Sequence, residues 1–321
     1  MLRTWLTDRF GLEVPLVGAP MAGVSDGRLA AAVSAAGGLG MFGVSPTSTA
    51  SWIAEQAAIA GGSTGGGGRP YGVGLMAWAL DDDPAQLDAV IAARPSLVSV
   101  SYGPYERYVE PLRQAGITVA TQAGTTDEAR AAEQAGVDVV VARGSEGGGH
   151  GRGEVATLPL LQSVLDAVRV PVLAAGGIAT ARGLAAVLAA GAEGAWVGTV
   201  FLACAETTAS EAARRHLLAA DETDTTYGRV FDLAQRLAWP AEYGGRALRN
   251  AFFDRWAGHE EELATDEQAP AELAAARRAD DFDTAYIYAG QAVGMIRRQR
   301  TAADVVADFA AAEELLGRFK A

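Results

Sequence analysis

Short apolar runs alternate with alanine-rich helical segments through the first two thirds of the chain, and this alternation constrains the fold more than any other feature. The runs are almost continuously apolar, as strands buried on both faces of a parallel sheet are. The predicted strands are Val14–Met21, Leu39–Gly43, Tyr71–Trp78, Leu97–Gly103, Thr118–Gly124, Val137–Gly144, Val170–Ile178 and Ala195–Leu202. The helical patterns between them include Asp26–Ala36, Thr47–Ala60, Pro84–Arg94, Thr126–Ala135, Thr157–Val168 and Thr180–Ala190. Eight strand–helix units in series favour a closed α/β fold, the (β/α)8 or TIM barrel, over an open doubly wound sheet.

The last third of the chain departs from this rhythm. From Glu206 to Asp283 the sequence becomes charged and helical in pattern, which predicts an inserted helical subdomain, or lid, over the mouth of the barrel. Two further helical patterns, Tyr286–Arg298 and Thr301–Phe319, are expected to return to the barrel. We therefore expect a barrel domain of residues 1–205 and 284–321 and a substrate-binding lid of residues 206–283.

Composition excludes several classes of function. Half of the 321 residues are hydrophobic and the formal charge is −13, so a large core is expected and nucleic-acid binding is not, because phosphate backbones are bound by basic stripes. No apolar run reaches the roughly 20 residues of a membrane span. The single cysteine, Cys204, excludes an internal disulfide, and the first residues are too polar for a signal peptide. We expect a cytoplasmic protein with no nucleic-acid or membrane partner; the oligomeric state is left open.

A glycine-rich loop follows the sixth predicted strand and carries a histidine. It reads Gly-Ser-Glu-Gly-Gly-Gly-His-Gly-Arg over Gly144–Arg152. Glycines let the backbone approach a flat or charged ligand closely, and His150 brings a proton-transfer group to the same place. The combination is typical of an active site. The alternative is a flexible surface loop with an incidental histidine.

Glycines also stand at the ends of the seventh and eighth predicted strands, in Ala174–Ile178 and Val197–Thr199. Exposed N–H groups at such turns, near a helix N-terminus, attract a phosphate dianion, and barrels commonly bind phosphate after these two strands. The alternative is that the glycines only permit tight turns. The chain has no phosphate-loop or dinucleotide motif and no His/Cys/Asp cluster with metal-ligand spacing, so no metal is expected.

Together these motifs resemble the nitronate monooxygenase family, formerly called 2-nitropropane dioxygenases. The resemblance is carried, in order, by Pro15–Gly23, Leu29–Gly40, Gly144–His150, Ala174–Ile178 and Gly198–Leu202, with an echo at Tyr288–Gln291. It implies an oxidoreductase with FMN as cofactor, a flavoprotein monooxygenase whose partners are a small alkyl nitronate, such as propionate 3-nitronate, and molecular oxygen.

The resemblance also implies roles for particular residues. His150 matches the catalytic histidine of the family, and Tyr288 is expected in the substrate cavity. The residues expected to bind FMN are Ala19, Pro20 and Met21 along the flavin ring, Gln122 at its polar edge or ribityl chain, Gly148 and Gly149 beside it, and Gly176, Gly177, Gly198 and Thr199 around its phosphate.

The chain departs from the family pattern at four places. Gly74 stands where an asparagine is usual, Val100–Gly103 replaces a His-Phe-Gly-like step, Arg143 stands where a glutamine is common, and Gly147 or Gly148 replaces an alanine in the histidine loop. Arg143 is expected either to hold an anion or to pair with Glu146 or Asp127. Two alternative functions stay open: an FMN-dependent enoyl-thioester or quinone reductase fed by NAD(P)H, and a flavin-binding protein without turnover.

Overall fold

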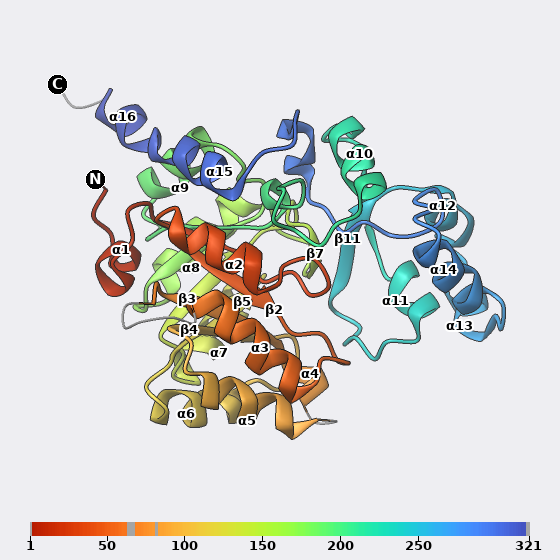
Figure 1. Ribbon diagram of the computed structural model, residues 1–321, viewed down its shortest axis with the longest axis horizontal. Coiled ribbons are helices and arrows are strands. Elements are labelled where there is room, and N and C mark those ends of the chain that lie inside the picture. The colour runs from red at the N-terminus through yellow and green to blue at the C-terminus, as the bar shows by residue number, and fades with distance from the viewer. Residues whose placement is uncertain (1, 63–67, 81–82, 319–321) are drawn as a thin grey trace.

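The computed structural model describes residues 2–62, 68–80 and 83–318, and its centre is a closed barrel of eight parallel strands (Figure 1). The strands, in barrel order, are β1 (Leu16–Gly18), β2 (Leu39–Gly43), β3 (Tyr71–Met76), β4 (Leu97–Ser101), β5 (Thr118–Ala123), β6 (Val139–Arg143), β8 (Val172–Ala175) and β9 (Ala195–Val197). β9 pairs in parallel with β1 and closes the sheet. Each strand lies inside one of the eight predicted ranges, so the predicted (β/α)8 barrel is confirmed.

Helix α1 precedes the first strand of the barrel, and the other helices lie around the barrel and after its strands. They are α1 (Trp5–Phe10), α2 (Gly27–Ala35), α3 (Ala50–Gly61), α4 (Ala77–Leu80), α5 (Pro84–Ala93), α6 (Glu106–Gln114), α7 (Thr126–Gln134), α8 (Thr157–Ala167), α9 (Ala181–Ala189), α15 (Ala302–Ala310) and α16 (Ala312–Gly317), with the short 3-10 helices η1 (Thr199–Phe201) and η2 (Gln291–Met295). Within the described part of the chain, no helix is long and apolar enough to cross a membrane.

The barrel strands are apolar throughout because both of their faces are covered. In β6, Val139 and Val141 belong to the cluster that fills the barrel, whereas Val140 and Ala142 belong to the larger cluster between strands and helices. Successive side chains of a strand point to opposite faces, so burial on both faces requires an uninterrupted apolar run. Leu6 of α1 also belongs to the cluster that fills the barrel, so α1 packs against the barrel interior. The rigid barrel leaves the carboxyl ends of the strands free to carry the site.

The segment expected to be a helical lid contains strands as well as helices. Its elements are α10 (Glu211–Ala219), β10 (Thr225–Gly228), α11 (Val230–Gln235), β11 (Gly244–Leu248), α12 (Ala251–Trp256), α13 (Glu260–Thr265) and α14 (Ala269–Arg278), most of which lie to the right of the barrel in Figure 1. β11 is the middle strand of a three-stranded antiparallel sheet. Its edge strands are β10 and β7 (Gly149–Gly151), and β7 belongs to the histidine loop. The purely helical prediction was wrong, because strand pairing with a loop about a hundred residues away leaves no local pattern. We call residues 206–283 the lid.

The chain after the lid is less helical than its pattern indicated. Residues 286–298 were predicted as a helix, but only η2 forms there. Tyr286 and Tyr288 pack instead in the apolar cluster of the lid, and Tyr288 forms a β-bridge with Ala247 of β11. The final helical pattern is confirmed, divided between α15 and α16, and its last residue, Phe319, lies outside the described residues.

Candidate active site

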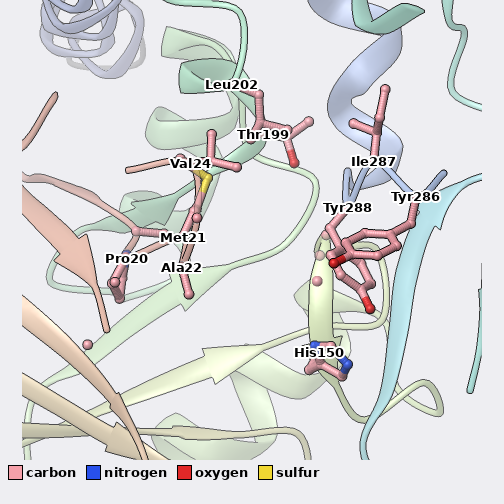
Figure 2. A pocket seen from close by; sticks show the side chains of 18 of the residues that line it. Pro20, Met21, Ala22, Val24, His150, Thr199, Leu202, Tyr286, Ile287 and Tyr288 are labelled. Carbon is pink, nitrogen blue, oxygen red and sulfur yellow. The ribbon is translucent and has the colours of Figure 1, made fainter. Parts of the chain in front are cut away.

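One cavity of about 520 Å³ opens at the carboxyl ends of the barrel strands, between the barrel and the lid. Its volume is typical of sites for small molecules and cofactors. All the site residues expected from the sequence line it: Ala19, Pro20, Met21, Gln122, Gly148, Gly149, His150, Gly176, Gly177, Gly198, Thr199 and Tyr288. Figure 2 shows Pro20 and Met21 on one side of this cavity and His150, below Tyr288, on the other.

The loops after β8 and β9 offer backbone N–H groups to the cavity. Gly176 and Gly177 have φ angles of +106° and +71°, which glycine adopts without strain. No described residue accepts a hydrogen bond from the N–H groups of Gly177, Gly198 or Thr199, although all three residues are half-buried. Such unpaired donors next to the N-terminus of α9 fit a phosphate dianion.

The segment Ala19–Met21 borders the cavity at the end of β1, and Gly74 of β3 makes its position possible. A Cβ atom at Gly74 would overlap Cβ and Cγ of Pro20. The ring of Pro20 therefore occupies the space that an asparagine side chain would need. At this position the cavity wall is formed by the ring of Pro20, and Gly74 contributes no polar side chain to it.

His150 is fixed by two residues of the lid, Asp232 and Trp239, with Tyr288, which follows the lid in the chain. Its Nε2 lies 2.7 Å from Oδ1 of Asp232, which follows the start of α11 and is 2% exposed. The hydroxyl of Tyr288 donates to the same oxygen over 3.1 Å. The indole of Trp239 stacks on the imidazole, with ring centroids 3.5 Å apart and planes 4° apart. The imidazole is thus held in one plane by an aromatic ring and in one direction by a carboxylate.

The other ring nitrogen of His150 remains available to a ligand. Nδ1 has no hydrogen-bond partner among the described residues, and His150 lines the cavity. When Nε2 donates its proton to Asp232, the lone pair of Nδ1 is free to accept a proton. The carboxylate then compensates the positive charge that the imidazole gains, as the buried aspartate does in catalytic triads.

Burial keeps the phenol of Tyr288 protonated. It raises the pKa of Tyr288 well above the usual 10.0, and the negative charge of Asp232 raises it further. Tyr288 therefore donates a hydrogen bond to Asp232 throughout the physiological range and acts as a neutral group.

Arg143 holds the glycine loop through hydrogen bonds to its backbone. Its Nη2 lies 2.9, 3.0 and 2.9 Å from the carbonyl oxygens of Gly147, Gly148 and Gly149. The side chain is buried, and burial lowers its pKa. Arg143 forms an ion pair with neither Glu146 nor Asp127. Its guanidinium donates hydrogen bonds to three carbonyl oxygens of the glycine loop, because buried backbone carbonyls need donors.

The glycines of this loop are needed for contacts within the protein as well. A Cβ at Gly148 would overlap the backbone of Gly290, and one at Gly151 would overlap the guanidinium of Arg143. The nearby Glu146 accepts hydrogen bonds from the N–H and hydroxyl of Thr157 over 2.8 and 2.9 Å, which anchors the loop at the start of α8. Glu146 therefore has a structural role, with Thr157 as its partner and not Arg143.

Asp232 and Trp239 were not expected in the site. Neither stands in a motif, and both lie in the segment whose strands were not predicted. The available signal was weak: an aspartate beside Val230 and Phe231, in an apolar stretch of an otherwise charged segment. A buried carboxylate requires a partner, and here His150 and Tyr288 provide it. Across the described residues, no group of three His, Cys, Asp or Glu is arranged to hold a metal ion.

Comparison with known proteins assigns a family to this site. A family model described as nitronate monooxygenase matches residues 53–312. The chain belongs to the nitronate monooxygenase family. Members of this family are enzymes, and the chain is an oxidoreductase.

Among individual relatives, a nitronate monooxygenase of Paraburkholderia phytofirmans is 33% identical over 292 residues, which cover 75% of each chain. A (3aS,4S,5R,7aS)-5-hydroxy-7a-methyl-1-oxo-octahydro-1H-indene-4-carboxyl-CoA dehydrogenase of Rhodococcus jostii is 38% identical over 231 residues, 72% of this chain. The aligned region spans only 64% of that dehydrogenase. The chain is thus similar to proteins named for two different substrate classes.

Two solved structures share the whole fold. FabK from Thermotoga maritima superposes with a TM-score of 0.86 at 30% identity and covers 100% of this chain and 99% of its own. A nitroalkane oxidase from Streptomyces ansochromogenes superposes with a TM-score of 0.81 at 32% identity and covers 97% of this chain and 99% of its own. Both likenesses extend through the lid.

Proposed function

We propose that the protein is an FMN-dependent nitronate monooxygenase that oxidises alkyl nitronates, such as propionate 3-nitronate, with molecular oxygen. One observation carries the proposal: His150 lines the cavity, binds a buried carboxylate through Nε2 and has no described hydrogen-bond partner at Nδ1, and unpaired N–H donors that fit a phosphate belong to residues of the same cavity. A proton acceptor next to a site for a phosphorylated cofactor is what this reaction requires.

The proposed FMN site uses three parts of the rim. Gly176, Gly177, Gly198 and Thr199 would hold the phosphate, Ala19–Met21 and Gly148–Gly149 would line the ring, and Gln122 would meet its polar edge or ribityl chain. FMN supplies the electron-accepting and oxygen-reducing chemistry when it is bound. Trp239 of the lid and Tyr288, which follows the lid in the chain, would exclude bulk water from the substrate.

The proposed role of His150 is proton transfer. Nδ1 takes the acidic proton from the carbon that bears the nitro group of a neutral nitroalkane, and the imidazolium that results holds the anionic nitronate. Asp232 fixes the ring and compensates its charge, and Tyr288 lines the substrate space and fixes Asp232. The small-molecule substrate, the barrel-and-lid division of the chain and a cytoplasmic location belong to the same proposal.

A second candidate is an oxidoreductase that acts on a coenzyme A thioester, or an NAD(P)H-dependent reductase of thioesters or quinones. The specific observation in its favour is the similarity to the carboxyl-CoA dehydrogenase. The proton next to a thioester carbonyl is acidic like that next to a nitro group, so the same histidine could serve either substrate.

An anaerobic visible spectrum of the purified protein distinguishes the candidates. We expect bound FMN whose oxidised spectrum is lost on addition of propionate 3-nitronate and is restored by air, while NADPH alone changes nothing. Loss of the spectrum with NADPH alone, and no response to the nitronate, would favour a reductase. A protein without flavin, or with flavin that no substrate reduces, would contradict both.

A further inference from the structure

A second cavity, of about 680 Å³, lies among α9, η2 and the C-terminal helices α15 and α16. Figure 1 shows α9, α15 and α16 together at the upper left, away from α12, α13 and α14 of the lid. None of the residues that line the second cavity also lines the cavity of His150. Its volume is sufficient for a small organic ligand.

Positive charge predominates around the second cavity. Among the described residues that line it, the charged side chains are those of Arg182, Arg297, Arg298, Arg300, Arg318, Asp308 and Glu314. Five arginines against two carboxylates leave an excess of three positive charges, in a chain whose formal charge is −13. A concave surface lined by one sign of charge attracts ligands of the opposite sign, so the second cavity favours an anion.

Two of the five arginines are not neutralised by a carboxylate. The other three form ion pairs: Arg297 with Asp221, Arg300 with Asp308 and Arg318 with Glu314. Within the described part of the chain, no carboxylate forms an ion pair with Arg182 or Arg298. Hydrogen bonds from Thr301 are the main cause of the lowered pKa of Asp304, to which Arg298 adds only a weaker electrostatic effect. Both guanidinium groups are therefore available to an anion, and a guanidinium can bind a phosphate through two parallel hydrogen bonds.

The start of α9 adds two backbone donors to the second cavity. Thr180 caps this helix by accepting a hydrogen bond from the N–H group of Gly183. No described residue accepts a hydrogen bond from the N–H groups of Ala181 or Arg182, and both residues line the second cavity but not the cavity of His150. The unpaired donors and the dipole of α9 thus favour a negative charge at a residue that also carries one of the unpaired guanidinium groups.

The rest of the lining is mostly aliphatic. It includes Val200, Ala203, Ile296 and Leu315, together with Met295, which is 55% exposed. Met295 is one of two large hydrophobic residues that are exposed in the described part of the chain. The described residues of the lining include no aromatic ring, so the base of a nucleotide would find no partner for stacking. A saturated carbon chain, in contrast, would remove Met295 from water.

We propose that the second cavity is a separate binding site for a phosphate ester with an aliphatic body. The phosphate group binds to the guanidinium groups of Arg182 and Arg298 and to the N–H donors of α9, and the aliphatic body covers Met295 and the apolar lining. The inference does not depend on the proposed function, because binding to the second cavity can be measured whether or not a nitronate is oxidised.

Isothermal titration calorimetry of the full-length protein tests the proposal with hexyl phosphate, methyl phosphate and hexan-1-ol as probes. An excess of FMN is present throughout, so that the proposed phosphate site of the other cavity is occupied. We expect hexyl phosphate to bind at least about tenfold more tightly than methyl phosphate, because the burial of two methylene groups is enough for that difference. Hexan-1-ol should bind more weakly than hexyl phosphate. Equal binding of the two phosphates, or tighter binding of ADP than of hexyl phosphate, would overturn the proposed ligand class.

Substitutions assign the binding to the second cavity. Arg182→Gln and Arg298→Gln should each weaken the binding of hexyl phosphate about fivefold, the loss expected for one exposed ion pair. Met295→Gln should weaken the binding of hexyl phosphate but not that of methyl phosphate.

The matched control is Arg169→Gln, because Arg169 is exposed and lines neither cavity. It should leave the binding of hexyl phosphate unchanged, and circular dichroism should show all four variants folded like the wild type. No binding of hexyl phosphate to the wild-type protein, or equal binding to Arg182→Gln, Arg298→Gln and Arg169→Gln, would refute the proposal.

Discussion

Asp232 gives one oxygen, Oδ1, to both His150 and Tyr288, while its Oδ2 is buried without a hydrogen-bond partner among the described residues. A carboxylate that is desolvated to this degree is costly unless a positive charge forms beside it. In the proposed reaction, Asp232 would compensate the positive charge that His150 gains with the proton of the substrate.

Asp232→Asn should lower kcat/KM on neutral nitroethane by about 100-fold, the lower end of what a positioned general base contributes. The amide cannot compensate the charge of the imidazolium, so the loss should be much smaller on ethyl nitronate, whose proton is already gone. Asp232→Glu should restore part of the activity. The matched control is Glu261→Gln, an exposed lid residue, which should have no effect. Equal losses on both substrates would indicate that Asp232 has only a structural role.

Gly74→Ala tests the packing of the cavity wall at the end of β1. The added Cβ would overlap the ring of Pro20, which cannot rotate away, so Ala19–Met21 must shift into the cavity. We expect the variant to be purified with less bound flavin and a weaker Kd for FMN, measured by fluorescence quenching. Gly317→Ala, at the exposed end of α16 with nothing within 4 Å of the added Cβ, is the control for a glycine substitution remote from the cavity. Unchanged affinity in Gly74→Ala would show that Pro20 does not define the site.

At the scale of elements, Arg143 connects β6 to the glycine loop. Arg143→Met removes the buried donor of three loop carbonyls and should lower the free energy of unfolding by about 3 kcal/mol, measured by urea denaturation at equal flavin content. Arg130→Met breaks an exposed ion pair with Asp127 and should cost less than about 1 kcal/mol. Similar losses in the two variants would refute the supporting role of Arg143.

The eight barrel strands could be predicted from the sequence because burial on both faces leaves a local record, a continuous apolar run. The sheet of β7, β10 and β11 could not, because β7 and β10 are short and only partly buried and β11 pairs with β7 about a hundred residues away. His150 was placed in the site through its glycine loop, and the proposed phosphate site rests on glycines at the ends of two strands. Asp232 and Trp239 were missed, because only the pairing of β11 with β7 brings the lid to the histidine.

At the scale of the whole molecule, buried tyrosines link stability to alkaline pH. Burial raises the pKa of Tyr102, Tyr286 and Tyr288. Below the ordinary pKa of about 10, these phenols are neutral in the folded and the unfolded protein, so they contribute nothing to the pH dependence of stability. Above it, the unfolded chain gains by ionising while the folded protein does not, so stability is lost as pH rises towards the folded pKa.

The Tm should therefore fall between about pH 9 and about pH 11, and the fall should be smaller in Tyr288→Phe, which lacks one of the ionising groups. Tyr288→Phe also loses the hydrogen bond to Asp232, but this lowers the Tm at both pH values and so cancels when the two decreases in Tm are compared. An identical fall in the two proteins would show that Tyr288 ionises as readily in the folded state as in the unfolded one.

The central claim is that His150 is the base of this site, and His150→Asn tests it most directly. The measurement is kcat/KM for nitroethane and for pre-formed ethyl nitronate, with bound flavin quantified in the same samples. We predict a loss of at least about 100-fold on the neutral nitroalkane, a loss of less than about tenfold on the nitronate, and unchanged flavin. Full activity on the neutral nitroalkane, with flavin bound, would contradict the account.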